Sequence, residues 1–156
     1  MLAVRVACVG KLKEGYWREA VAEYEKRLRP LCRFEILEVP ESRLPSAPTP
    51  GDIAQALERE GELLLQKSTG QLCPLCIEGR QVDSPGLARL LKKAMQSPGA
   101  ITFLIGSSHG LSQAVKDSGR GVSMSPMTFP HQLARVMLCE QLYRAFQIIG
   151  GTKYHK

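Results

Sequence analysis

The sequence predicts a single α/β domain over residues 1–156, built on a mostly parallel sheet with helices on both faces. Three observations predict this fold class. Short apolar runs of strand length alternate with longer segments whose apolar residues recur at helical spacing. Such alternation is typical of parallel sheets, because each connection must cross back over the sheet before the next strand begins. The length and the 44% hydrophobic content provide one continuous core without metal or disulfide staples.

The first part of the chain predicts two strands joined by a helix. Residues 2–9 are rich in valine and alanine and end at Gly10, which indicates a buried strand followed by a turn. Residues 17–28 alternate apolar and charged residues at helical spacing, so we expect an amphipathic helix that ends before Pro30. Residues 34–39 predict the second strand.

The middle of the chain predicts a loop, a helix and a third strand. Residues 40–50 contain four prolines among serines, which favours a mobile loop without regular structure. Asp52 is placed to cap a helix that runs to about residue 66. Residues 72–77 then supply the third strand.

The next elements follow the same alternation. Ser84 and Pro85 form a cap and first-turn pair, from which we expect a helix with one apolar face. Residues 101–105 form an apolar strand that leads into Gly106, and residues 122–124 predict a last short strand.

Pro130 begins a final helix whose apolar surface is broader than one core contact requires. Two explanations remain open. The helix is either buried at the centre of the monomer or also forms an interface between subunits.

Lysine and arginine outnumber aspartate and glutamate by 21 to 15, which gives a formal charge of +6. The excess favours a polyanionic partner such as nucleic acid, but many basic proteins bind none, so charge leaves both possibilities open. The five cysteines are odd in number and widely spaced, which favours reduced thiols. No signal-like segment or membrane-length apolar run is present, so we expect a cytoplasmic protein without a membrane partner.

Two segments have the composition of ligand-binding loops. Residues 106–110, Gly-Ser-Ser-His-Gly, follow a predicted parallel strand at the end where ligands bind, although a tight structural turn would use the same residues. They do not form a dinucleotide-binding fingerprint. Residues 123–130 are apolar but interrupted by prolines, so their backbone groups could bind an adenine ring or simply form a packed connector.

The C-terminal tail, residues 150–156, combines a glycine hinge with an aromatic residue, a histidine and two lysines. Tyr154 could stack on a base, Lys153 and Lys156 could meet phosphates, and His155 could accept a proton. A frayed, solvated end is the alternative interpretation.

Several segments occur in an order that resembles the ribosomal RNA large subunit methyltransferase H family. The similarity extends over the whole chain and is carried by residues 9–13, 103–110, 125–135, 140–146 and 154–156. The resemblance implies a SPOUT-class methyltransferase, a homodimer whose C-terminal part forms a deep trefoil knot around S-adenosylmethionine. It also implies the substrate, a pseudouridine in helix 69 of large-subunit (23S) ribosomal RNA, methylated at N3 in the assembled ribosome.

The resemblance implies a cofactor site in three parts of the chain. The implied contacts are Leu75, Gly106, Met124, Ser125, Pro126, Met127, Thr128 and Phe129. The family usually has a second glycine where this chain has Ser107, whose side chain would lie close to the cofactor. The donor already carries an activated methyl group, so the expected chemistry requires no metal.

Three residues near the C-terminus are candidates for catalysis. His155 is the candidate general base for the N3 proton, Tyr154 would hold the base, and Arg144 would stabilise negative charge on the ring oxygens. Arg144 follows Glu140 by one helical turn, so a helical salt bridge is the alternative. His131 and Arg135 have the same spacing and could face RNA or merely solvate the final helix.

Two other functions are open to the sequence. A noncatalytic module that binds RNA or the ribosome would account for the charge and would differ in binding no cofactor. Cys73 and Cys76 have the spacing of a thiol redox pair, but they lie in a predicted strand, whereas such pairs more often begin a helix.

Overall fold

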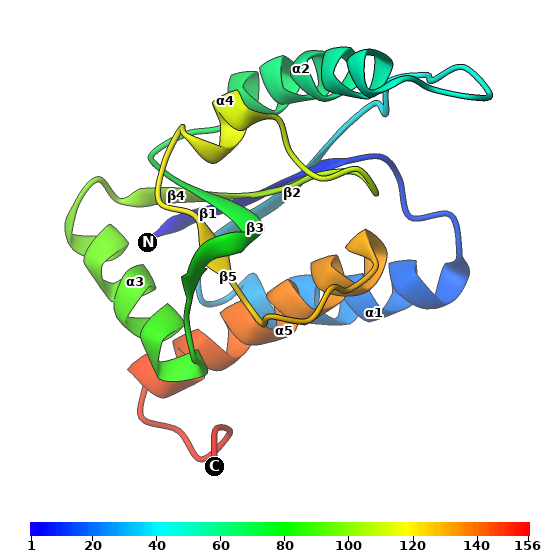
Figure 1. Ribbon diagram of the computed structural model, residues 1–156. Helices are drawn as coiled ribbons and strands as arrows, with labels where there is room; N and C mark the ends of the chain where they lie inside the picture. Colours follow the sequence, from blue (N-terminus) through cyan, green and yellow to red (C-terminus); the bar gives the residue numbers. More distant parts are fainter.

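The computed structural model describes residues 1–156 and contains one sheet of five parallel strands in the order β2-β1-β4-β3-β5 (Figure 1). The parallel α/β prediction is therefore confirmed. The elements in chain order are β1 (Ala3–Val9), α1 (Gly15–Leu28), β2 (Arg33–Val39), α2 (Pro50–Gln66), β3 (Gln71–Gln81), α3 (Ser84–Gln96), β4 (Ala100–Ile105), α4 (Gln113–Lys116), β5 (Val122–Ser123) and α5 (His131–Ile149).

Helices cover both faces of the sheet, and the alternation of side chains along the strands explains how (Figure 1). Val4 and Val6 of β1 point into the larger core with α1, α3 and α5, whereas Ala7 belongs to the smaller core beneath α2 and α4. In β4, Phe103 and Leu104 divide in the same way. Successive residues of a strand point to opposite faces, so each buried strand serves two cores.

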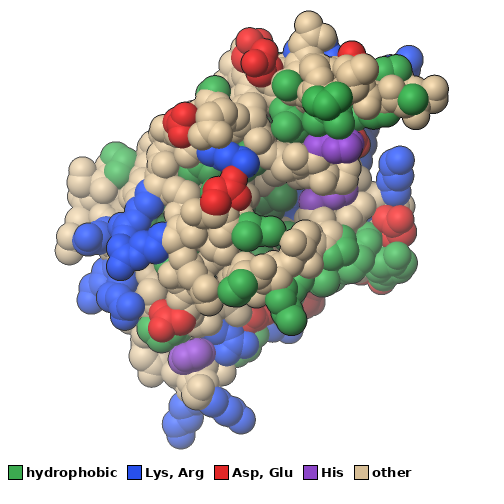
Figure 2. Space-filling view, in the orientation of Figure 1, with side chains coloured by type: hydrophobic (Ala, Val, Ile, Leu, Met, Phe, Trp, Pro, Cys, Tyr) green, Lys and Arg blue, Asp and Glu red, His purple; other side chains and the backbone are tan.

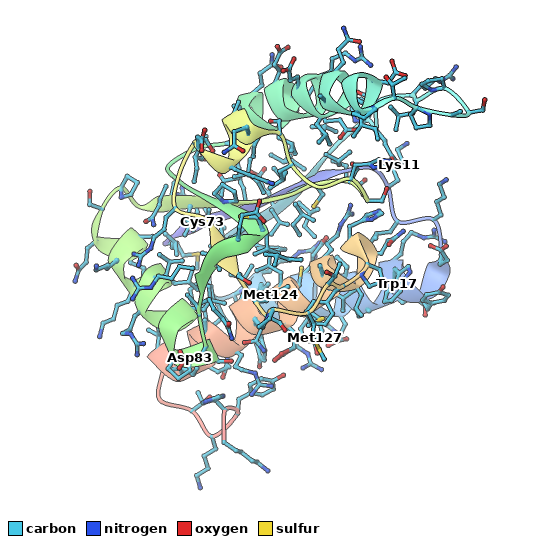
Figure 3. The ribbon with its side chains drawn as sticks, viewed as in Figure 1. Lys11, Trp17, Cys73, Asp83, Met124 and Met127 are labelled. Atoms are coloured by element: carbon cyan, nitrogen blue, oxygen red, sulfur yellow. The ribbon has the colours of Figure 1, made fainter.

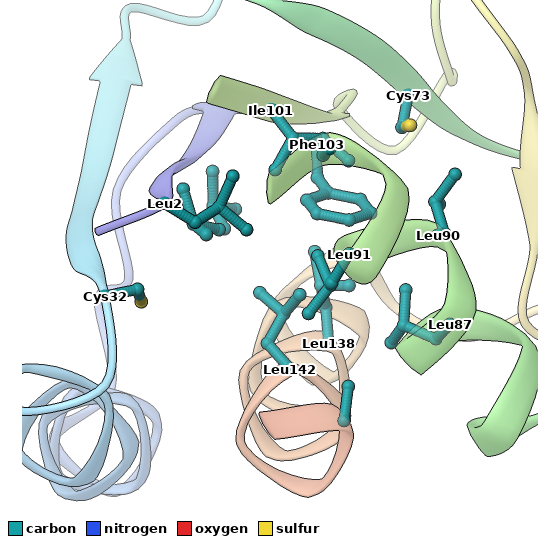
Figure 4. Packing of buried hydrophobic residues seen from close by; sticks show 14 of the residues in the cluster. Leu2, Cys32, Cys73, Leu87, Leu90, Leu91, Ile101, Phe103, Leu138 and Leu142 are labelled. Carbon is teal, nitrogen blue, oxygen red and sulfur yellow. The ribbon is translucent and has the colours of Figure 1, made fainter. Parts of the chain in front are cut away.

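Helix α5 lies at the centre of the larger core. Leu138 and Leu142 are fully buried among side chains of α3 and β4, including Leu91 and Phe103 (Figure 4). The helix packs against both α1 and α3. Its broad apolar surface is thus explained in part by burial within one subunit. None of the helices is long and apolar enough to span a membrane.

The residues that cap the N-termini of α2 and α3 precede those predicted from the sequence. Thr49, not Asp52, caps α2: its hydroxyl accepts from the Asp52 N–H at 3.1 Å, while the Asp52 carboxylate accepts from the Thr49 N–H at 2.9 Å. The pair forms a capping box, in which both residues resemble caps in sequence. Asp83 rather than Ser84 caps α3 by accepting from the Gly86 N–H at 2.7 Å.

Four cysteine thiols are buried, and burial in apolar surroundings disfavours the thiolate. It raises the pKa of Cys8, Cys32 and Cys139 to about 12 and that of Cys73 to about 11, from an ordinary value of 9.0. All of the cysteines are free.

These thiols predict a loss of stability in alkali. Above pH 9 the unfolded chain releases thiol protons that the folded chain retains, so the free energy of unfolding should fall as pH rises toward the folded pKa values. Each thiol contributes about 1.4 kcal/mol per pH unit in that interval. Urea unfolding of wild type and Cys8→Ala between pH 8 and 10 measures the effect. Identical pH slopes for the two proteins would contradict it.

Candidate active site

The sheet separates at the C-terminal end of β4, where β3 continues past it. The two strands pair only as far as Pro74 and Leu104, after which β3 continues beside β5 with a shift in register between Leu75 and Arg80. The connection after β4 runs to α4 on one face, and the connection after β3 runs to α3 on the other. Adjacent parallel strands whose connections leave on opposite faces form a crevice that commonly binds ligands.

A cavity of about 720 Å³ occupies this crevice. Its walls come from the diverging part of β3, the loop after β4 and the segment from β5 into α5, which supply residues 75–78, 105–111, 122–125, 127–132 and 134, together with Lys116. Seven of the eight expected cofactor residues line it, and Pro126 does not. The structure therefore brings together segments that lie as far apart in the sequence as Leu75 and Phe129.

The loop after β4 is closed tightly on itself. A Cβ at Gly106 would lie 2.1 Å from the Gly110 carbonyl oxygen, and the Gly110 N–H donates to the Ser107 carbonyl at 2.9 Å. Gly106 is thus required by the loop's own backbone. The Ser107 side chain is buried, and its hydroxyl accepts a long hydrogen bond of 3.4 Å from the His109 N–H.

The connector between β5 and α5, residues 124–130, crosses in front of α5 with Met124 and Met127 along it (Figure 3). No backbone hydrogen bond joins Met124, Thr128 or Phe129 to the rest of the main chain. Ser125 orders the turn instead: its hydroxyl accepts from the Met127 N–H at 3.0 Å, and its carbonyl accepts from the Ser123 hydroxyl at 3.0 Å. The connector therefore presents free donors and acceptors beside the cavity.

Two charged groups of the cavity wall, Lys116 and Glu78, were not singled out in the sequence, whereas His131 was. Lys116 of α4 forms an ion pair with Glu78 of β3, and this contact lowers the pKa of the Glu78 carboxyl. His131, the first residue of α5, also lines the cavity, and partial burial lowers the pKa of its imidazole despite the opposing effect of Glu41. The pairing of Lys116 with Glu78 depends on a contact between two elements, which local sequence does not reveal.

The Arg135 side chain is buried, so it faces neither solvent nor an RNA bound to the surface of this chain. Its side chain is 3% exposed, and its Nη1 donates to Glu38 Oε2 at 2.6 Å. Nη2 donates to the Gly10 carbonyl at 3.1 Å, while Nε is buried without a partner. The interpretation of Arg135 as an outer residue was therefore wrong: it joins α5 to the ends of β1 and β2.

The three catalytic candidates lie together, but apart from the cavity. Arg144 Nη1 is 3.3 Å from His155 Nδ1, and the Arg144 guanidinium lies 4.9 Å from the centre of the Tyr154 ring. Arg144 Nε also donates to Glu140 Oε1 at 2.7 Å, so the helical salt bridge is present. His131 and Arg144 are separated by about 20 Å along α5, from the rise of 1.5 Å per residue. One chain thus holds the two halves of the expected site at opposite ends of α5.

The tail is docked on the body of the protein. Tyr154 packs edge-on against Tyr143 of α5 with ring centres 4.9 Å apart, and the Thr152 hydroxyl donates to Gln147 Oε1 at 2.8 Å. Tyr154 and His155 are partly buried. The picture of a freely solvated end was therefore wrong.

Cys73 and Cys76 do not have the environment of a redox pair. Both belong to β3, and Cys73 is completely buried in the larger core. Burial raises the pKa of both thiols, that of Cys73 to about 11. Because the thiolate is the reactive form, these residues are structural.

Solved structures share this fold. A probable methyltransferase from Bordetella pertussis Tohama I aligns with a TM-score of 0.59 at 18% identity, over 93% of this chain and 95% of that one. A probable methylase family protein from Haemophilus influenzae Rd KW20 aligns at 0.53 and 11% identity, over 97% and 67%. TrmJ from Z. mobilis ZM4 aligns at 0.50 and 11% identity, over 93% and 70%.

The sequence itself matches a protein family over almost its entire length. The model described as "Predicted SPOUT methyltransferase" matches residues 2–155. That range includes the cavity, the connector and the docked tail as far as His155. The chain belongs to the SPOUT methyltransferase family.

Proposed function

We propose that this protein transfers a methyl group from S-adenosylmethionine to N3 of a pseudouridine in helix 69 of 23S ribosomal RNA, acting in the cytoplasm on the assembled ribosome. The observation that carries the proposal is the cavity at the split between β3 and β4, in a chain of the SPOUT methyltransferase family. The choice of substrate rests on the family resemblance in the sequence segments described above.

The cavity is suited to S-adenosylmethionine in both size and chemistry. A volume of about 720 Å³ lies within the range usual for cofactor sites. The free backbone groups of Met124, Thr128 and Phe129 are available to the edge of an adenine ring, and Leu75 provides an apolar wall. Glu78, held close by Lys116, offers a negative charge for a cationic donor.

The cofactor supplies an activated methyl group, so the protein must align the acceptor nitrogen and stabilise the deprotonated ring. His155 is the proposed base for the N3 proton. Tyr154 would stack on the nucleobase, and Arg144, positioned by Glu140, would stabilise negative charge on the ring oxygens.

The separation of the tail from the cavity supports a homodimer. Arg144, Tyr154 and His155 lie at the opposite end of α5 from the cavity of their own chain, so we propose that a second subunit brings its tail to this cavity. We also propose that the C-terminal part of each subunit forms the trefoil knot that the family resemblance implies. Sedimentation should give about twice the chain mass of 17.2 kDa. A concentration-independent monomer with full activity would contradict the dimer.

Gly106 provides a direct test of the cofactor site. In Gly106→Ala the new Cβ would collide with the Gly110 carbonyl and open the loop, so we expect calorimetric affinity for S-adenosylmethionine to fall at least roughly tenfold. Gly15→Ala is the matched control, because its Cβ would have no neighbour closer than 3.7 Å. Unchanged affinity in a folded Gly106→Ala protein would remove the loop from the site.

The function is tested on ribosomes from cells that lack the gene. Purified protein and S-adenosylmethionine should add one methyl group to a single pseudouridine of helix 69, detected by mass spectrometry of the isolated nucleosides. Methylation of a different nucleotide would overturn the substrate. A protein that binds ribosomes but no S-adenosylmethionine would be a noncatalytic module, contrary to the proposal.

A further inference from the structure

A second groove, of about 570 Å³, lies between α3 and the outer edge of the sheet. Four cationic side chains line it, Arg80, Arg89, Lys93 and Arg120, and the only acid is Asp83. Figure 2 shows lysine and arginine side chains gathered on this side of the molecule, beside α3. Four cations thus line a groove that the proposed methyl transfer has not used.

Arg80 and Arg120 are brought together by closely packed backbone. The Arg80 N–H donates to the Gly121 carbonyl at 3.0 Å, and the Arg120 N–H donates to the Leu72 carbonyl at 3.1 Å. A Cβ at Gly79 would lie 2.6 Å from the Gly121 backbone, so only glycine permits this approach. The two arginines consequently project from neighbouring chain segments whose positions are fixed.

Arg89 and Lys93 project from one side of α3, because they are one helical turn apart. The opposite side of the helix is anchored by buried Leu87 and Leu91. Both cationic side chains are exposed, so they can rearrange around a ligand without loss of core packing.

The groove contains little negative charge to balance these cations. Arg89 lies 4.0 Å from Asp83, and each of the two side chains is 74% exposed, so their attraction is largely screened by water. The Asp83 carboxylate is already used to cap α3. Arg80, Lys93 and Arg120 form no ion pair within the chain.

The groove adjoins the cofactor cavity. Val122 lines both, and β3 contributes Glu78 to the cavity and Arg80, two residues further, to the groove. Two residues of a strand span about 7 Å. An extended ligand in the groove can therefore continue to the mouth of the cavity.

We infer that this groove binds the phosphodiester backbone of the RNA that flanks the target nucleotide. Successive cations along an open groove match a chain of phosphates better than one small anion, which would engage only part of them. Such contacts fix the position of the RNA without reading its sequence. This inference rests on the proposed function, because it assigns the groove to the substrate of the neighbouring cavity.

The test compares two double variants that remove the same charge. Arg89→Gln/Lys93→Gln changes the groove, and Arg59→Gln/Lys67→Gln changes an exposed cation of α2 and the exposed cation that follows this helix, on the opposite face of the sheet. The probe is a fluorescein-labelled single-stranded RNA of mixed sequence, with binding followed by anisotropy between 50 and 200 mM salt. The groove variant should bind roughly tenfold or more weakly at low salt, with a salt dependence reduced by about 1.4 units of log–log slope, about 0.7 for each cation removed.

The control should bind like wild type, and both variants should keep wild-type affinity for S-adenosylmethionine. Equal losses in the two variants, or no RNA binding by wild type at 50 mM salt, would overturn the groove assignment. Tighter binding of a polyglutamate peptide than of RNA, lost in the groove variant, would assign the groove to an acidic protein instead. Failure of the wild-type protein to bind S-adenosylmethionine would overturn the proposed function, a result distinct from each of these.

Discussion

Deletion of residues 153–156 is expected to reduce methyl transfer to ribosomes at least roughly a hundredfold, because it removes both the proposed base, His155, and the stacking ring of Tyr154. Affinity for S-adenosylmethionine should largely remain, since the roles proposed for Tyr154 and His155 concern the nucleobase, and the expected cofactor contacts lie in other segments of the chain. The measurements are turnover on unmethylated ribosomes and calorimetric binding of the cofactor.

Because the tail is docked on α5, the deletion should also lower the stability of the protein slightly. Loss of the edge-on contact between Tyr154 and Tyr143 should lower the free energy of unfolding by about 1 kcal/mol. Tyr154→Phe keeps this ring contact, and removal of Lys156 alone keeps both proposed functional residues, so the two serve as matched controls. Normal turnover by the truncated enzyme would show that the tail is only a docked end and that the base lies elsewhere.

Glu38→Ala is expected to lower the free energy of unfolding by about 3 kcal/mol, because it leaves the buried guanidinium of Arg135 without its carboxylate. We expect the lower end of the range for a broken buried pair, since Glu38 is 35% exposed and water can replace part of the contact. Urea unfolding measures the change.

The same strand provides the control. Glu35 of β2 pairs with Arg5 at 2.9 Å, but both side chains are substantially exposed, so Glu35→Ala should change stability by less than about 1 kcal/mol. The double variant Glu38→Gln/Arg135→Met should recover much of the loss, because it no longer buries an unpaired charge. A Glu38→Ala protein as stable as Glu35→Ala would show that the buried Arg135–Glu38 pair stabilises the fold no more than the exposed Arg5–Glu35 pair.

The sequence predicted the order of strands and helices along the chain, because the spacing of apolar residues indicates which side chains are buried. The loop at Gly106 and the connector, which the sequence singled out, line one cavity because they lie where parallel strands end, and such ends meet at one edge of a sheet. The cap of α2 was predicted three residues too late because Thr49 and Asp52 each accept a hydrogen bond from the other's backbone N–H, and either residue alone resembles a cap.

Long-range pairing explains what the sequence did not reveal. Arg135 and Arg144 look alike along α5, but Arg144 pairs with Glu140 one turn away, whereas Arg135 meets a carboxylate 97 residues away. The groove cations come from β3, α3 and the segment before β5, and no local run of charge marks them. The docked tail was missed because the Tyr154–Tyr143 contact involves a side chain from the preceding helix, beyond the glycine pair at 150–151.

The central place of α5 has a consequence for synthesis of the protein. The helix is the last regular element of the chain, but Arg135 bonds to Gly10, 125 residues away, and Leu138 and Leu142 complete the core begun by β1. Until residues 131–149 leave the ribosome, the part of the sheet that α5 covers between α1 and α3 keeps its apolar side chains in water. Nascent chains stopped before His131 should therefore bind chaperones and aggregate, and complete chains should fold slowly, because their decisive contacts join the two ends of the sequence.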